Sequence, residues 1–226
     1  MSAPISSQET FHGFIYMAFE IILLPVLLQA LNRFMGGFFS ESELNFLFFL
    51  LNFLSVICIF HRFLQKSVKK LFQHPICFLQ TVVLGLAAYL GCSVLLNRLI
   101  PLFRPGFVNL SDAGIASLAR DSLFLMAVGT VILVPPVEEC FFRGLIFRNL
   151  YEKNIFLAYI VSMLAFSSIH LLGYLGKMSA ADLLICTLQY LPAGACLAWS
   201  YQKADSIYAP IVIHALINFR GICSMR

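Results

Sequence analysis

The stretch SLFLMAVGTVILVPPVEECFFRG, residues 122–144, joins an apolar run without charged residues to two glutamates and an arginine. Crossing the hydrocarbon core of a bilayer takes about 20 helical residues, and runs free of Asp, Glu, Lys and Arg mark the candidates. A helix satisfies its own backbone hydrogen bonds inside lipid, whereas an isolated strand cannot. The stretch therefore predicts a transmembrane helix with charged groups at its end.

The rest of the chain has the same character. Apolar residues make up 60% of its 226 residues and charged residues 12%, against roughly 45–50% and about 25% in soluble domains. Apolar runs that suit membrane spans lie at residues 12–32, 44–61, 75–97, 121–137, 154–172, 183–202 and 206–219. The sequence thus predicts an all-α fold, a polytopic bundle of about seven transmembrane helices whose surroundings are the lipid bilayer.

The charged residues lie mainly at the ends of these runs. The net charge of +4 is small and does not gather on one face, so no nucleic-acid partner is expected. The densest positive cluster is the linker Arg62–His74, which favours a cytoplasmic position for that loop and for the N-terminus. Residues 98–120 contain prolines, glycines and polar residues, and they predict a loop followed by an interfacial helix.

The acid pair follows two consecutive prolines, residues 135–136, which predict a helix that begins there. Glu139 and Arg143 are four residues apart, so they share one helical face and are expected to pair. Glu138 is rotated by about 100° from Glu139. It has no local cation and is expected to point into the bundle, where desolvation suits a general base. The alternative is a helix start at the membrane surface, with these residues and Arg148 all solvated.

Two other apolar segments carry polar groups. His170 ends the run AFSSIH, and His214 and Asn218 share one face of the last segment. Taken alone, His170 also suits a packed or interfacial histidine, but polar groups within spans normally face partners or water. Gathered in one cavity with Glu138, they could cleave an amide. Glu138 would take a proton from water, one histidine would hold that water or donate to the leaving amine, and the other histidine with Asn218 would stabilise the oxyanion.

The same groups allow a second mechanism. Glu138, His170 and His214 could hold a divalent metal such as zinc, which lowers the pKa of its bound water to about 7. The HExxH helix of zinc peptidases is absent. The sequence leaves both mechanisms open and assigns no cofactor.

Taken together, the motifs resemble those of the CPBP family, the CAAX prenyl-protease and bacteriocin-processing membrane proteins, also called Abi proteins. The family motifs EExxxR, FxxxH and HxxxN occur here, in order, as Glu138-Glu139-Cys-Phe-Phe-Arg143, Phe166-Ser-Ser-Ile-His170 and His214-Ala-Leu-Ile-Asn218. The resemblance covers roughly residues 118–222. It implies a membrane-embedded endopeptidase with Glu138 as the base, His170, His214 and Asn218 in the same cavity, and Glu139, Arg143 and Phe166 as supporting residues. Family members are described both as glutamate-dependent and as metal-dependent peptidases.

The predicted organisation has two parts, N-terminal transmembrane helices without catalytic motifs in residues 1–117 and a catalytic core in residues 118–226. Family substrates include prenylated CAAX proteins and bacteriocin or signalling-peptide precursors, and some members confer self-immunity. The compact chain favours a bacterial cell membrane, and a peptide precursor or membrane-associated protein as substrate. Two alternatives stay open: a non-catalytic immunity or scaffold protein of the same fold, and a proton- or ion-coupled transporter.

Overall fold

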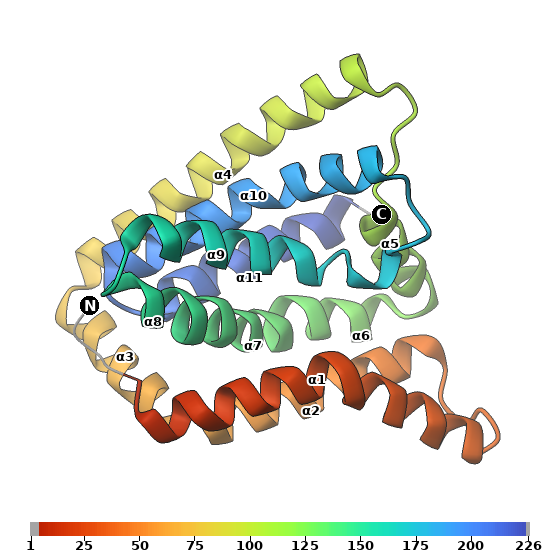
Figure 1. Cartoon of the computed structure of the whole chain (residues 1–226), viewed down its shortest axis with the longest axis horizontal. Helices are drawn as coiled ribbons and strands as arrows, with labels where there is room; N and C mark the ends of the chain where they lie inside the picture. Colours follow the sequence, from red (N-terminus) through yellow and green to blue (C-terminus); the bar gives the residue numbers. More distant parts are fainter. Residues whose placement is uncertain (1–4, 225–226) are drawn as a thin grey trace.

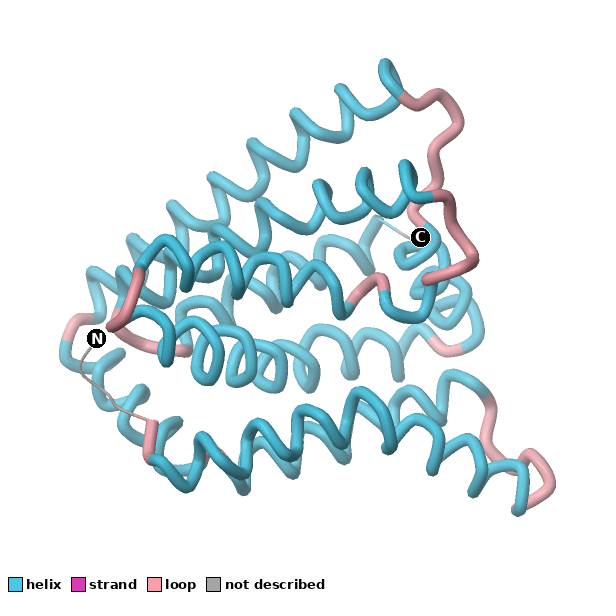
Figure 2. Tube along the Cα trace, viewed as in Figure 1, coloured by secondary structure: helices cyan, strands magenta, loops and turns pink. Residues whose placement is uncertain are grey.

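The computed structural model describes residues 5–224, and it confirms the all-α fold: these residues form helices and short connections without any strand (Figures 1 and 2). In chain order the helices are α1 (Ser7–Phe34), α2 (Glu41–Ile59), α3 (His61–Gln73), α4 (Pro75–Phe103), α5 (Leu110–Asp121), α6 (Leu123–Val128), η1 (Gly129–Leu133), α7 (Val134–Glu139), η2 (Cys140–Phe147), α8 (Arg148–Tyr151), α9 (Ile155–Ile169), η3 (Leu172–Tyr174), α10 (Ala180–Ala204) and α11 (Tyr208–Ser224).

Each predicted apolar segment coincides with a helix of the bundle. Five helical stretches are long and apolar enough to cross a membrane: Ser7–Phe34, Glu41–Ile59, Pro75–Phe103, Leu123–Tyr151 and Ala180–Ala204. The shorter α9 and α11 pack against them, and α10 lies among α4, α9 and α11. The chain is therefore an integral, multi-pass membrane protein.

The stretch 123–151 is one continuous helix, so the prediction that a helix begins at the prolines is wrong. Two π-helical turns, η1 and η2, flank the short α7 that holds Pro135 and Pro136. In η1 the N–H of Val134 bonds to the carbonyl of Gly129, five residues back. A π-helical turn widens the helix and shifts its hydrogen bonds, which accommodates residues that cannot donate. The acid pair therefore lies within the helix, not at its start.

Two short helices mark the opposite ends of the bundle (Figure 1). The basic segment predicted as a linker is a helix, α3, which buries Phe63 and Leu64 against the bundle and exposes Arg62 and Lys66. The helix predicted in residues 98–120 is present as α5, after the loop that follows α4, and its interfacial position stays a prediction. The cytoplasmic position of the basic end stays a prediction.

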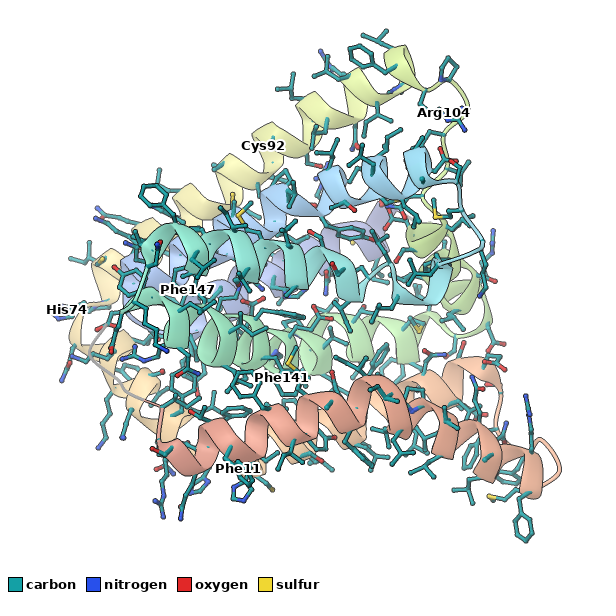
Figure 3. The ribbon with its side chains drawn as sticks, in the orientation of Figure 1. Phe11, His74, Cys92, Arg104, Phe141 and Phe147 are labelled. Atoms are coloured by element: carbon teal, nitrogen blue, oxygen red, sulfur yellow. The ribbon has the colours of Figure 1, made fainter. Side chains whose placement is uncertain are left out.

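Aromatic side chains fill much of the core of the bundle. Phe141 and Phe147 are buried and point into the bundle, whereas Phe11 on α1 is 64% exposed and points outward (Figure 3). Many large apolar side chains of α1 and α4 are exposed in the same way, for example Ile22 and Leu79. Such apolar outer faces suit contact with lipid, since the surrounding acyl chains are equally apolar.

Candidate active site

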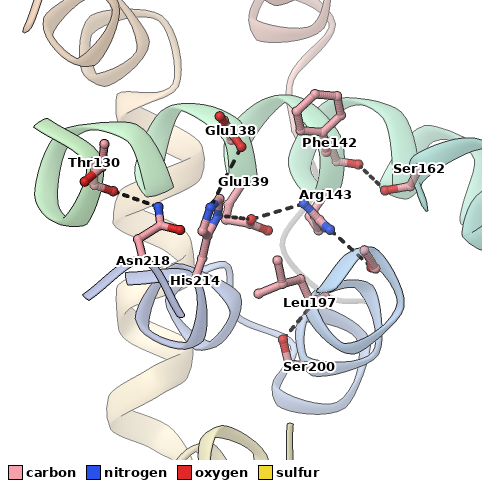
Figure 4. Close-up of polar contacts among 11 residues, drawn as sticks. Thr130, Glu138, Glu139, Phe142, Arg143, Ser162, Leu197, Ser200, His214 and Asn218 are labelled. Atoms are coloured by element: carbon pink, nitrogen blue, oxygen red, sulfur yellow. Dashed lines mark hydrogen bonds and ion pairs between the residues drawn. The ribbon is translucent and has the colours of Figure 1, made fainter. Parts of the chain in front are cut away.

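Glu139, Arg143 and His214 form a buried cluster at the centre of the bundle (Figure 4). The side chains of Glu139 and Arg143 are fully buried, and Arg143 Nη1 donates to Glu139 Oε1 at 3.1 Å. The pairing expected from their spacing is thus present. The alternative of a solvated helix start is wrong, because Glu139, Arg143 and Arg148 are all buried.

Arg143 is also held from two other directions. Its Nη2 donates to the carbonyl of Gly194 on α10 at 3.1 Å. Its guanidinium carbon lies 4.6 Å from the ring centroid of Phe166 on α9, a distance at which a cation is attracted to the ring face. Arg143 therefore ties the first motif to two neighbouring helices.

His214 lies between the two acids. Its Nδ1 is 2.8 Å from Glu139 Oε1, and its Nε2 is 3.9 Å from Glu138 Oε2. The first distance is that of a hydrogen bond, in which a carboxylate oxygen acts as the acceptor. The second distance is too long for a direct hydrogen bond, but it allows one water molecule to contact both atoms.

Glu138 faces a large cavity. Its side chain is 20% exposed, and Oε2 has no hydrogen-bond partner within the described part of the chain. The cavity measures about 1230 Å³ and is lined by Glu138, His170, His214 and Asn218 together with residues of α2, α4, α5 and α10. The structure thus brings the four predicted site residues to one space, whose walls come from both of the predicted parts of the chain.

His170 is packed between two aromatic rings. The ring of Phe166 lies 4.8 Å from it and that of Tyr190 lies 4.5 Å away, centroid to centroid. Phe166 also contacts the ring of His214 at 5.7 Å. The phenylalanine of the second motif therefore touches both imidazoles and the guanidinium. Tyr190 was not predicted from the sequence, which contains no signal for it.

Asn218 reaches from α11 to the first π-helical turn. Its Nδ2 donates to the carbonyl of Thr130 at 2.8 Å (Figure 4). This carbonyl is available because the Val134 N–H bonds to Gly129 and Pro135 has no N–H. The sequence analysis also missed Thr130. Its signal is the proline five residues later, because Pro135 has no N–H to donate to the Thr130 carbonyl in a π-helical turn.

A metal was one of the two predicted mechanisms. Among residues 5–224, no three His, Cys, Asp or Glu side chains are arranged to hold a metal ion, so Glu138, His170 and His214 are not such a group. His214 turns Nδ1 to Glu139, which leaves Nε2 facing the cavity, and Phe166 packs against both imidazole rings. The metal mechanism therefore stays a prediction.

Comparisons with known proteins fall on this part of the chain. Residues 120–220 match the family model described as Type II CAAX prenyl endopeptidase Rce1-like. Over 95 residues the chain is 35% identical to the "Putative membrane peptidase YdiL" of Bacillus subtilis (strain 168), an alignment that covers 42% of this chain and 34% of that protein. The chain thus spans about a third of the length of this relative. No solved structure matches.

Proposed function

We propose that this chain is a CAAX-protease-type membrane protein of the CPBP family and an intramembrane endopeptidase, a proposal supported by the family-model match over residues 120–220 and by the bacterial relative. The observation that carries the proposal is the pair of Glu138 Oε2 and His214 Nε2, 3.9 Å apart, on the wall of a cavity that His170 and Asn218 also line. Such an arrangement supplies a base, donors and room for a peptide within the membrane.

The proposed reaction begins with a water molecule in contact with Glu138. The carboxylate takes one proton as the water oxygen bonds to the peptide carbonyl carbon. Negative charge develops on the carbonyl oxygen, where Asn218 and His214, one helical turn apart on α11, donate hydrogen bonds. The C–N bond then breaks, and the proton passes from Glu138 to the leaving amine, which regenerates the carboxylate. His170 holds the water or donates to the amine.

Glu139 and Arg143 act on His214 in this proposal. To donate from Nε2 while Nδ1 donates to Glu139, the ring of His214 must carry both protons. Glu139 compensates that charge at 2.8 Å, and Arg143 holds Glu139 in place at 3.1 Å. The buried pair thus orients and stabilises the ring without touching the substrate.

The substrate we propose is a peptide precursor or a membrane-associated protein, and the location a bacterial cell membrane. A bacterial relative and a chain composed almost entirely of membrane helices and short connections support this choice over a prenylated substrate. Processing of a bacteriocin-like precursor, with self-immunity as a consequence, is one form that this activity would take.

The test is cleavage of a candidate precursor by purified protein in detergent. Glu138→Gln keeps the size of the side chain and removes the base, so the rate should fall by about 10²- to 10⁴-fold. Glu152→Gln is the matched control, because Glu152 is 74% exposed and lies beyond the catalytic helix turns. Wild-type rates from folded Glu138→Gln protein would refute the role of Glu138.

Two further assays, one in cells and one in sealed vesicles, separate the alternatives. A scaffold or immunity protein would protect cells with or without Glu138 and release no peptide product. A transporter would show ion flux across sealed vesicles that depends on Glu138 or His214, again without a product.

A further inference from the structure

The helix α5 forms one wall of the catalytic cavity. Asn109 and residues 111–118 line it, at the end of the bundle opposite to α3 (Figure 1). The connection before α5 contains Gly106 with φ of 75°, a conformation that favours glycine. After α5, Ser122 is extended before the next helix begins. The wall is therefore a separate short helix with a non-helical joint at each end.

Side-chain hydrogen bonds join α5 to two neighbouring helices. On the α2 side, the buried Ser42 Oγ donates to the Leu118 carbonyl at 2.9 Å. On the other side, Asn109 Nδ2 donates to Gln189 Oε1 at 3.0 Å, and the Tyr190 hydroxyl donates to Asp112 Oδ1 at 3.3 Å. Both partners are consecutive residues of α10. The second bond is longer than the usual 2.7–2.8 Å of O–H···O bonds, so it is weak and can be broken at small cost.

Tyr190 has a second contact, on the catalytic side. Its ring lies 4.5 Å from that of His170 with an interplanar angle of 70°. The other neighbour of this imidazole is Phe166, at 4.8 Å and 63°. Edge-to-face packing between two rings leaves the imidazole little freedom to rotate. One side chain therefore contacts both the cavity wall and a proposed catalytic histidine.

We propose that Tyr190 is a positioning residue that couples the closure of α5 to the orientation of His170. With α5 in place, Asp112 holds the hydroxyl of Tyr190, and its ring holds the imidazole. When α5 moves aside to admit a substrate, the hydroxyl is released and His170 becomes free to turn. The site is then assembled only while the cavity is covered, which limits competing reactions with bulk water. The role of His170 in this coupling rests on the proposed function.

The kinetic test separates the ring of Tyr190 from its hydroxyl. Tyr190→Ala removes the packing against His170 and should lower kcat about 10- to 100-fold, the usual effect of a misplaced catalytic group. Tyr190→Phe keeps that ring but has no hydroxyl for Asp112 to hold, so His170 should lose part of its orientation and kcat should fall to a value between wild type and Tyr190→Ala. Asp112→Ala should match Tyr190→Phe. The double variant should be no worse than either, because both remove the same bond.

A second measurement does not need proteolysis. Hydrogen–deuterium exchange of the α5 amides, in the Glu138→Gln protein without substrate, should be faster in Tyr190→Phe and in Asp112→Ala. Tyr159→Phe is the matched control, since Tyr159 also donates across helices, to Gln202, away from the cavity.

The outcomes distinguish the two proposals. Absence of cleavage by wild-type protein would refute the proposed function, while exchange in α5 would still decide whether Tyr190 holds that helix. Normal kcat in folded Tyr190→Ala, or unchanged α5 exchange in both Tyr190→Phe and Asp112→Ala, would overturn the coupling. Additive losses in the double variant would also overturn it.

Discussion

The buried ion pair of Glu139 and Arg143 allows a direct test of how buried charge affects the stability of the bundle. Arg143→Met keeps a long, flexible side chain at this position but removes the charge and the hydrogen bonds of Arg143 to Glu139 and to the Gly194 carbonyl. Glu139, fully buried, is then left with His214 as its partner. The substitution therefore leaves a buried carboxylate without its permanently charged partner.

The expected cost follows from this burial. Removing one member of a buried ion pair destabilises a protein by about 3–5 kcal/mol. For a chain of this size each kcal/mol lowers the unfolding midpoint by about 2–4 °C, so Arg143→Met should unfold about 6–20 °C below wild type. In the double variant Glu139→Gln/Arg143→Met no buried charge remains at this pair, and most of the loss should be regained.

The assay is thermal unfolding in detergent, followed by far-UV circular dichroism of the helices. Arg104→Met is the matched control, because the pair of Arg104 and Asp182 is partly exposed and screened by solvent. Its midpoint should stay close to wild type. An unchanged midpoint in Arg143→Met, or a double variant that unfolds as early as the single one, would show that the charge balance does not govern stability here.

Three further predictions use other contacts. Asn218→Ala removes the donor to the Thr130 carbonyl and one proposed oxyanion donor, so initial rates should show kcat reduced about 10²-fold; a normal kcat would remove Asn218 from the mechanism. Gly194→Ala would place a Cβ 3.1 Å from Met163 Cα, a backbone atom, and should cost about 1–3 kcal/mol in the unfolding free energy, whereas Gly91→Ala meets nothing within 4 Å and should not. Treatment with a chelator should leave cleavage unchanged, since the described residues offer no three-ligand group; loss of activity that zinc restores would contradict this.

The spans could be predicted because lipid imposes a simple rule on sequence. A segment that crosses the membrane must be long and apolar, and it must pair its own backbone groups, so composition alone locates it. The prolines at 135–136 were misread because a helix start and a widened helix interior both tolerate missing N–H groups. The hydrogen bond from Val134 to Gly129, five residues back, cannot be predicted from the hydropathy of the sequence.

The site could be predicted only as far as chemistry and helical spacing reach. Glu139 and Arg143 pair along one helix, so their separation in the sequence is enough. The contact of His170 with Tyr190 joins α9 to α10, and no periodicity relates two helices to each other. Residues that act between helices therefore need the structure, even where each helix is clear from the sequence.

The hydrogen bond of Asn218 replaces one that Pro135 cannot make. Pro135 cannot donate a hydrogen bond, and the Val134 N–H is used by Gly129, so the Thr130 carbonyl needs a donor from elsewhere. An unpaired carbonyl inside a membrane costs several kcal/mol, and Asn218 supplies that donor. One hydrogen bond thus fixes α11 against the helix that carries Glu138 and Glu139, one turn away from His214. The missing donor at Pro135, just before the first motif, therefore helps to set the position of the third motif.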